Sequence, residues 1–229
     1  SRPLNERPEL IIQFSYIEDF YFYYQSKLYG GTNYGFDFSD LIYYASMYID
    51  HVHNNNFLLF EHIIIDEYQD ISYMRYEFMH QIAKQNKAKI TAVGDDWQSI
   101  FSFAGSNIEY IYNFQKYFKG AKLLSITNTY RNSQELINIS TKFIMKNQAQ
   151  IAKNLYSHKT LKRPIEFIYY INPRKALQKV LNKLDNNYLI LGRNNFDIGY
   201  FTKEKANFLT IHSAKGLEAE NVIIINLTN

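Results

Sequence analysis

The stretch EHIIIDEYQDIS, residues 61–72, decides the fold expected for this chain. Three consecutive isoleucines, Ile63–Ile65, run directly into the carboxylates of Asp66 and Glu67. A short apolar run without alternation is typical of a strand that is covered on both faces inside a parallel sheet. Ligands of such sheets bind where the strands end. The stretch therefore predicts a parallel α/β fold with acidic groups at a ligand-binding edge.

Helical and strand patterns alternate along the rest of the chain, which favours the same α/β class. The helix beginning at Asp37 has a side chain suited to cap it, and Pro173 suits the first turn of a later helix. Helices are expected at 9–29, 37–52, 72–84, 107–117, 133–147 and 173–184, and strands at 63–65, 89–93, 122–126, 165–171, 188–191, 208–211 and 222–225.

Composition sets limits on the class of protein. The chain has 229 residues, of which 46% are hydrophobic, so it can bury a core and is not globally disordered. It has no cysteine, which excludes disulfides and thiolate metal sites. The net charge of +3 permits a polyanionic partner without requiring one. No apolar run approaches the roughly 20 residues of a membrane span, and the beginning of the chain does not resemble a signal peptide. We expect a cytoplasmic protein.

Two predicted strands end in acidic residues. Asp66 and Glu67 follow the first, in the arrangement called Walker B, where the aspartate serves Mg2+ and the glutamate accepts a proton from the attacking water. The second strand leads into GDDWQS, residues 94–99, where the amide of Gln98 suits contact with a γ-phosphate or with that water. Taken alone, Asp66 and Glu67 could be solvated carboxylates that begin a loop. Taken alone, GDDWQS could be a tight loop with a helix cap.

Two further stretches carry polar residues at predicted turns. In NTYRNSQELINIS, Arg131 precedes a helix start and suits contact with phosphate oxygens. In FLTIHSAKGLEAENVIII, His212, Lys215, Gly216 and Glu218 gather between two strands, where contacts to a ribose or a phosphate fit. Taken alone, Arg131 could be an ordinary surface arginine, and the second stretch could be an ordinary polar turn between two strands.

Together the four stretches resemble the conserved motifs of UvrD/Rep-type superfamily 1 DNA helicases. DEYQD resembles motif II, GDDWQSIFSFAGS motif III, TNTYRNS motif IV and TIHSAKGLEAENV motif V, in the order of that family. FDFSDLI, residues 36–42, resembles a segment that precedes motif II in this family. The residues DWQS and FAGS within the motif III stretch resemble the helicase IV branch in particular. The implied fold is that of RecA-like, P-loop NTPase-type parallel sheets in two incomplete units, residues 1–127 and 128–229.

The resemblance implies a role for each matching residue. It implies ATP and Mg2+ as cofactors, with Asp66 at the metal and Glu67 activating water. Gln98 and Arg131 would contact the γ-phosphate. The remaining roles are implied by position: Tyr130 near the adenine, Glu218 at the ribose, Lys215 and Gly216 at the nucleotide, Phe103 with Phe101 stacking on DNA bases, and Thr210 and His212 at the DNA backbone.

Two departures from the family pattern bear on these roles. Ala104 stands where many members carry arginine, so one charged contact is absent. The segment between Arg131 and Thr210 is too short for the large insertion that many relatives carry there. We therefore expect that insertion to be missing or much reduced, as in the helicase IV branch.

Two family elements do not occur in these residues. No G-x-x-x-x-G-K-[ST] sequence is present, and where Gly30 and Gly35 have its spacing, Phe36 stands in the place of the lysine. The arginine-bearing motif VI does not follow motif V. We therefore expect a fragment of a longer helicase that hydrolyses ATP negligibly by itself, with a naturally degenerate protein as the second explanation.

The expected parent activity is ATP-dependent translocation on single-stranded DNA with unwinding of duplex DNA. Its partners would be DNA together with repair, recombination or transcription proteins, and no membrane. The alternative from another class is a non-catalytic helicase-like module that binds nucleic acid or RNA polymerase. The near-complete set of motif residues argues against that alternative, because a pure binder does not need them. A third interpretation is the helicase part of a recombination nuclease-helicase.

Overall fold

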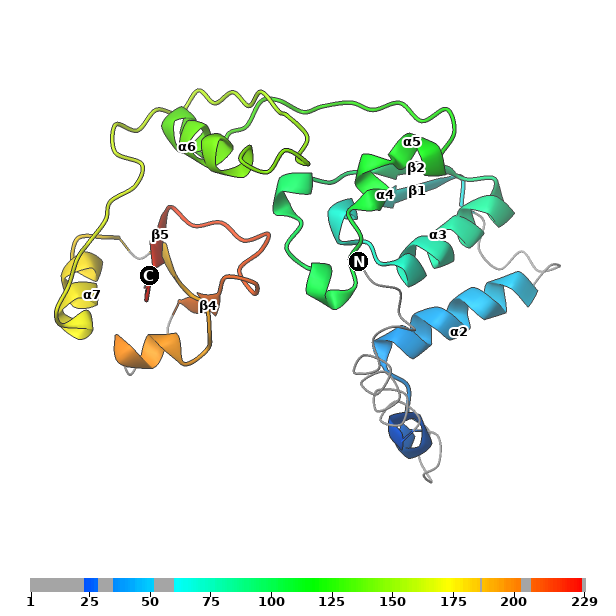
Figure 1. Cartoon of the computed structure of the whole chain (residues 1–229), viewed down its shortest axis with the longest axis horizontal. Helices are drawn as coiled ribbons and strands as arrows, with labels where there is room; N and C mark the ends of the chain where they lie inside the picture. The colour runs from blue at the N-terminus through cyan, green and yellow to red at the C-terminus, as the bar shows by residue number, and fades with distance from the viewer. Residues whose placement is uncertain (1–22, 29–34, 52–59, 186, 203–206, 228–229) are drawn as a thin grey trace, which may run out of the picture. The chain divides into compact units, whose positions relative to one another are not determined.

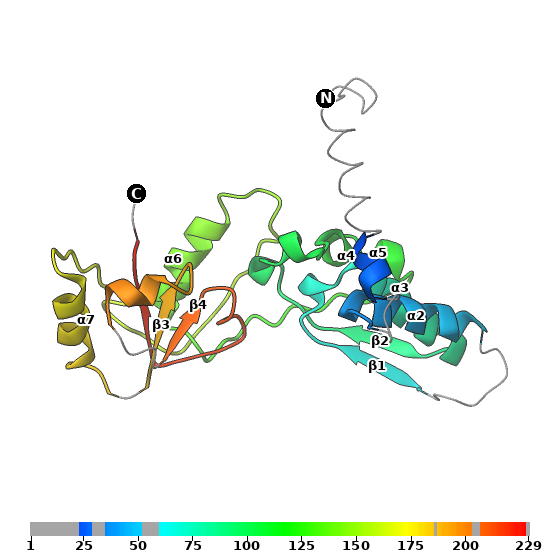
Figure 2. The same cartoon turned by 90° about the horizontal axis from the view of Figure 1, so that it is seen from below.

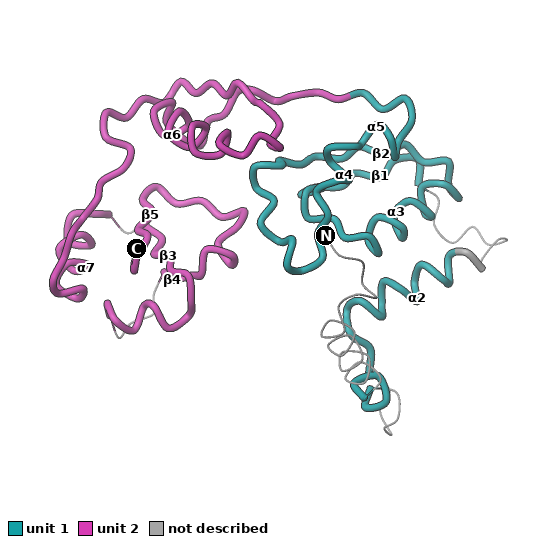
Figure 3. The backbone as a smooth tube through the Cα atoms, in the orientation of Figure 1, with its two compact units in different colours: residues 1–122 teal, residues 123–229 magenta. Residues whose placement is uncertain are grey.

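The computed structural model describes residues 23–28, 35–51, 60–185, 187–202 and 207–227 (Figure 1). They fall into two compact units, one within residues 1–122 and one within residues 123–229 (Figure 3). The boundary expected from the sequence was between residues 127 and 128. Each unit has a parallel sheet and an apolar core of its own. The α/β, RecA-like fold class is confirmed.

The sheet of the first unit contains the strand that opens the sequence argument. β1 (His62–Ile65) pairs in parallel with β2 (Lys89–Ala92), with Ile63 opposite Ile90 and Ile65 opposite Ala92. The two strands lie side by side in both views (Figures 1 and 2). Because both run in the same direction, their carboxyl ends lie at one edge of the sheet.

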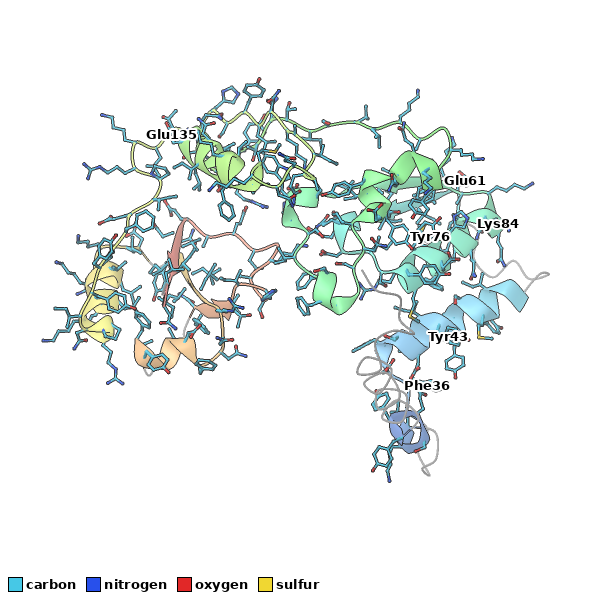
Figure 4. All side chains as sticks on the ribbon, viewed as in Figure 1. Phe36, Tyr43, Glu61, Tyr76, Lys84 and Glu135 are labelled. Atoms are coloured by element: carbon cyan, nitrogen blue, oxygen red, sulfur yellow. The ribbon has the colours of Figure 1, made fainter. Side chains whose placement is uncertain are left out.

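Helix α3 (Tyr73–Asn86) connects these strands and covers one face of their sheet. It begins where the Ser72 hydroxyl accepts a hydrogen bond from the Arg75 amide, and it ends at Lys87, whose φ is 52°. Tyr76 (labelled in Figure 4) is buried on its inner face and stacks on Tyr110, with ring centroids 4.5 Å apart. Such a ring pair contributes about 0.5–1.5 kcal/mol beyond the area that it buries.

Helix α2 (Phe38–His51) contacts α3. Its start is a reciprocal cap, because the Asp40 amide donates to Asp37 Oδ1 at 2.8 Å and the Asp37 amide donates to Asp40 Oδ2 at 3.1 Å. The helix predicted at 37–52 and its cap are confirmed. Of the helix predicted at 9–29, residues 23–28 are described and are helical, and the remainder lies outside the described residues.

The chain after β2 passes through short elements: 3-10 turns η3 (Asp96–Gln98) and η4 (Ser102–Ala104), then α4 (Glu109–Tyr112) and α5 (Phe114–Tyr117). The prediction of one helix at 107–117 is wrong. The chain leaves the helical conformation at Asn113, where φ is −105° and ψ is 28°, so two short helices form. Both pack on the core around Tyr68.

The second unit has a three-stranded parallel sheet of order β4-β3-β5 in its described residues. The strands are β3 (Tyr188–Gly192), β4 (Phe208–Thr210) and β5 (Asn221–Ile224), and the helices are α6 (Gln134–Ile144) and α7 (Pro173–Leu181). Ser133 caps α6 and Asn172 caps α7, each by accepting a backbone N–H three residues on. α7 and the 3-10 turn η5 (Asp197–Tyr200) contribute Leu177 and Ile198 to the core of this unit.

Two predicted strands, 122–126 and 165–171, do not form. Both segments are extended without a ladder, and their apolar side chains are exposed, with Leu124 92% and Tyr169 95% accessible. Apolar composition alone does not make a strand, because the backbone also needs a pairing neighbour. The expectation that both sheet faces are covered is likewise wrong for β1, since Ile64 is 75% exposed.

None of the described helices is both long enough and apolar enough to cross a membrane.

Candidate functional site

The candidate site in the first unit begins at the carboxyl end of β1. Asp66 and Glu67 are both exposed there. Glu67 is in the left-handed conformation, with φ 50° and ψ 41°, which is uncommon for a residue with a side chain. The Asp66 Oδ1 atom accepts a hydrogen bond from the Glu67 amide at 2.8 Å. The turn therefore stops the strand abruptly and presents two adjacent carboxylates to solvent.

Gln69 connects these carboxylates to the loop after β2. It is only 1% exposed, and its Nε2 atom donates to Glu67 Oε2. Its Oε1 atom accepts a hydrogen bond from the Asp95 amide at 2.9 Å. The sequence analysis did not select Gln69. The one signal in the sequence that could have found it is the position of a neutral amide between acidic residues.

Gly94 allows this approach of the loop to Gln69. A Cβ atom at Gly94 would lie 2.9 Å from Gln69 Oε1, closer than real Cβ contacts, and a tight 3.0 Å from Ile111 Cδ1. A backbone pair supports the same contact, because the Tyr68 amide donates to the Val93 carbonyl at 2.9 Å. The two strand ends are therefore held together by side-chain and backbone contacts at one sheet edge.

Gln98 belongs to the loop that Gln69 holds. Asp95 caps the η3 turn by accepting the Trp97 amide at 3.1 Å, and its Oδ2 atom accepts from Gln98 Nε2 at 2.7 Å. A continuous hydrogen-bonded path therefore runs from Glu67 through Gln69 and Asp95 to Gln98. The structure thus brings three of the predicted catalytic residues, Asp66, Glu67 and Gln98, to one edge of one unit.

Two phenylalanines follow at the η4 turn. The rings of Phe101 and Phe103 lie 6.0 Å apart, and Phe103 is 73% exposed. An exposed aromatic ring of this kind is suited to stack on a base of single-stranded nucleic acid, which is the role predicted for Phe103.

In the second unit, Arg131 and Glu218 form an ion pair. Arg131 Nε lies 2.9 Å from Glu218 Oε2, and both side chains are mostly exposed. The pair joins segments 87 residues apart in the chain. Beside it, Tyr130 is 69% exposed. Three predicted nucleotide-binding residues of this unit are therefore close together and accessible.

The remaining predicted residues surround the turn that follows β4. Thr210 Oγ1 accepts the Ser213 amide at 3.2 Å, which begins the turn, and Gly216 has a φ of 82° near its end. His212 is exposed and Lys215 is half-buried in the same turn. The turn leads directly into Glu218, so the residues predicted for DNA and for nucleotide occupy one continuous segment.

A buried carboxylate in the second unit was also missed from the sequence. Asp197 is 1% exposed and accepts hydrogen bonds from the Asn194 amide at 2.8 Å and from Asn226 Nδ2 at 3.0 Å. The bond from the Asn194 backbone, supported by that from Asn226, lowers the pKa of the Asp197 carboxyl. A Cβ atom on Gly192 would lie 3.0 Å from Asp197, so this network closes over the end of β3.

The donor set bears on the expected Mg2+. No group of three or more His, Cys, Asp or Glu side chains suited to hold a metal occurs in the described part of the chain. Mg2+ usually keeps several waters and takes one or two protein carboxylates together with nucleotide phosphates. Asp66, exposed at a strand end, fits that mode of binding.

A parallel α/β unit with a strand ending in adjacent aspartate and glutamate, linked to a second loop at the same edge, is an arrangement of the RecA-like class of fold. Residues 12–119 match the family model described as the UvrD/REP helicase N-terminal domain. These residues match the N-terminal domain of the UvrD/Rep-type helicases, which is the family that the motifs resemble.

Individual relatives agree with this assignment. DNA helicase IV of Escherichia coli (strain K12) is 30% identical over 83% of this chain and 29% of its own length. ATP-dependent DNA helicase Rep of Buchnera aphidicola subsp. Acyrthosiphon pisum is 26% identical over 95% of this chain and 38% of its own length. The likeness to helicase IV predicted from motif III is confirmed. The chain spans less than two-fifths of the length of either relative.

Proposed function

We propose that this chain is part of an ATP-dependent DNA helicase that couples ATP hydrolysis to translocation on single-stranded DNA and to duplex unwinding. The observation that carries the proposal is the hydrogen-bonded path from Glu67 through Gln69 and Asp95 to Gln98, in a chain whose relatives are named ATP-dependent DNA helicases. That path joins a candidate base to a candidate phosphate sensor, which is the arrangement that coupling needs.

In this mechanism Asp66 would hold the Mg2+ that neutralises charge on the phosphates. Glu67 accepts the proton of the attacking water, since its exposed carboxylate lies beside Asp66 and is oriented by Gln69. The Gln98 amide contacts the γ-phosphate or the water. Loss of the γ-phosphate then changes the contacts of the loop that carries Gln98.

We further propose nucleotide contacts for the candidate residues of the second unit. The Arg131 guanidinium would stabilise charge on the transferred phosphoryl group, and Tyr130, Lys215, Gly216 and Glu218 would contact the adenine, phosphates and ribose. The support is the exposure of Tyr130, Arg131, Gly216 and Glu218 and the Arg131–Glu218 pair within one unit. Because an exposed ion pair contributes little free energy, Arg131 can exchange Glu218 for another partner at small cost.

The nucleic-acid contacts would be made by stacking and by backbone contacts. Phe103, beside Phe101, would stack on a base, which tolerates any sequence. Thr210 and His212 would contact the phosphate backbone from the turn after β4. We propose a cytoplasmic location and partners among repair, recombination or transcription proteins, because a DNA motor works where DNA is processed.

The test uses the complete polypeptide that contains this sequence. We expect single-stranded DNA to stimulate its ATP hydrolysis, and Glu67→Gln to lower kcat about a hundredfold or more, because the general base is lost. The matched control is Glu61→Gln, an exposed glutamate at the opposite end of the same strand (labelled in Figure 4), which should leave kcat unchanged.

The 229-residue chain alone should hydrolyse ATP negligibly, because no Walker A sequence lies within it. DNA-stimulated turnover by this chain that Glu67→Gln abolishes would contradict that expectation. A complete polypeptide that binds nucleic acid or RNA polymerase but does not hydrolyse ATP would overturn the helicase proposal in favour of a binding module.

A further inference from the structure

Gln69 is the one fully buried amide that contacts both loops of the candidate site in the described residues. It is 1% exposed, although glutamine is usually a surface residue. Burial of an amide is costly unless its donors and acceptors are paired. Both ends of this amide are paired, Nε2 to Glu67 and Oε1 to the Asp95 amide at 2.9 Å. The amide is therefore held by a specific pair of contacts on two different loops.

The two contacts of Gln69 have different consequences. Donation to Glu67 Oε2 fixes the direction of a carboxylate that is otherwise exposed at a strand end. Acceptance from the Asp95 amide fixes the start of the η3 turn, and Asp95 in turn accepts from Gln98 Nε2 at 2.7 Å. A displacement of the loop that carries Asp95 and Gln98 would therefore also move the Glu67 carboxylate, because the Gln69 side chain is hydrogen-bonded to both.

Steric fit supports the same contact. Gly94 has no space for a Cβ atom, because one would lie 2.9 Å from Gln69 Oε1 and 3.2 Å from the Gln69 backbone nitrogen. The Ser99 hydroxyl also lies 3.5 Å from the Gln69 carbonyl oxygen, at the other end of the η3 turn. The loop encloses Gln69 from both sides.

We propose that Gln69 is the positioning residue that ties the Glu67 carboxylate to the Gly94–Gln98 loop, so that the group that activates water and the amide that reads the γ-phosphate respond together. This inference rests on the proposed function, since it assigns Glu67 and Gln98 their roles in hydrolysis. It adds that hydrolysis and loop position are coupled through the side chain of Gln69.

The kinetic experiment compares two substitutions in the complete polypeptide. Gln69→Met keeps the length of the side chain but removes both polar contacts, and Gln69→Glu keeps an acceptor for the Asp95 amide but replaces the donor to Glu67 with a repelling oxygen. We expect both variants to lower kcat for DNA-stimulated ATP hydrolysis about tenfold to hundredfold, with the KM for ATP changed less than about threefold.

The structural experiment measures amide hydrogen exchange in the 229-residue chain. We expect Gln69→Met to accelerate exchange at the Asp95 amide about tenfold or more, and Gln69→Glu to leave it near the original rate. The matched control for both experiments is Gln115→Met. Gln115 is exposed on α5 and donates to the Ala121 carbonyl at 2.9 Å, away from the site.

The outcomes separate this inference from the proposed function. If the unsubstituted polypeptide does not hydrolyse ATP, the proposed function fails and the catalytic part of the inference fails with it. If that polypeptide is active and both variants keep full kcat, or raise KM alone, only the role of Gln69 is overturned. Unchanged exchange at Asp95 in Gln69→Met would overturn the link to the loop. If Gln69→Met does not fold, Gln69→Glu decides, because it retains the contact with Asp95.

Discussion

The two units hold their candidate residues in different ways. In the first unit, the carboxylate of Glu67 is tied to the neighbouring loop through Gln69, which is 1% exposed. In the second unit, Arg131 and Glu218 meet on the surface, with side chains 54% and 69% exposed. A buried, fully paired amide rigidifies its surroundings, whereas an exposed ion pair contributes about 0–1 kcal/mol.

This difference is consistent with a division of labour between the units. Groups that carry out proton transfer need a fixed direction before substrate binds, and the first unit provides that with a buried network. The exposed Arg131–Glu218 pair can instead exchange partners at small cost when a ligand binds. The comparison predicts that substitutions in the exposed Arg131–Glu218 pair affect ligand chemistry far more than folding.

The largest expected effect comes from Arg131→Ala in the complete polypeptide. We expect kcat for DNA-stimulated ATP hydrolysis to fall about a thousandfold or more, because an arginine that contacts the transferred phosphoryl group contributes on that scale. The midpoint of chemical unfolding should stay nearly unchanged, since the ion pair with Glu218 is exposed. Steady-state kinetics and urea unfolding measure the two quantities.

Arg163→Ala is the control for Arg131→Ala. Arg163 is an exposed arginine of the same unit, and its removal should leave kcat within about twofold. An Arg131→Ala variant that keeps more than a tenth of the activity, or that unfolds much more easily, would break the contrast between the units.

A smaller effect is expected from Phe103→Ala. Phe103 belongs to the first unit but is exposed, so it should act on ligand binding and not on folding. Loss of one stacked base contributes about 1–3 kcal/mol, which weakens single-stranded DNA binding about fivefold to 150-fold. Fluorescence anisotropy with a labelled oligothymidine at fixed salt measures this change.

Phe167 is the matched control, because it has the same 73% exposure as Phe103 but lies in the second unit. Phe167→Ala should leave DNA binding unchanged. Equal losses of affinity in the two variants would show a general contribution of exposed aromatic rings, and would remove Phe103 from the proposed DNA contacts.

The smallest expected effect concerns the pH dependence of stability in the second unit. The folded pKa of Asp197 is lowered, so this carboxylate stabilises the fold fully above its ordinary pKa of 3.8. That contribution is lost as the pH falls through the lowered folded pKa. We therefore expect the urea midpoint to fall on acidification below about pH 4.

The Asp197→Asn variant should be less stable than the original chain at neutral pH and should show a weaker loss on acidification. Asp185→Asn, at an exposed carboxylate, is the control and should change neither. An unchanged acid response in Asp197→Asn would show that other carboxylates set it, and that the buried network over β3 contributes little.

Local signals in the sequence were sufficient for most elements and for the residue types of the site. The apolar runs of β1 and β5 and the cap at Asp37 are short-range features, and they were predicted close to their observed positions. The motifs likewise identified Asp66 and Gln98 as neighbours of a site, because parallel strands end at one edge.

The predictions that failed depended on partners distant in the chain. Segments 122–126 and 165–171 are as apolar as the real strands, but no ladder reaches them in the described structure, and apolar composition does not specify a neighbour. Gln69 was missed because its acceptor role depends on Asp95, 26 residues away. A short window of sequence shows neither which segment a strand will pair with nor that Gln69 will meet Asp95.

The amino-acid order was enough to predict the class of fold, the resemblance to a helicase family and the acidic strand ends, because periodicity, capping and motif order can be read from the sequence itself. Folding in three dimensions was needed to bury Gln69 between Glu67 and Asp95 and to set Arg131 against Glu218. Those pairs join segments up to 87 residues apart, and the packing of the sheets and loops decides which distant side chains meet.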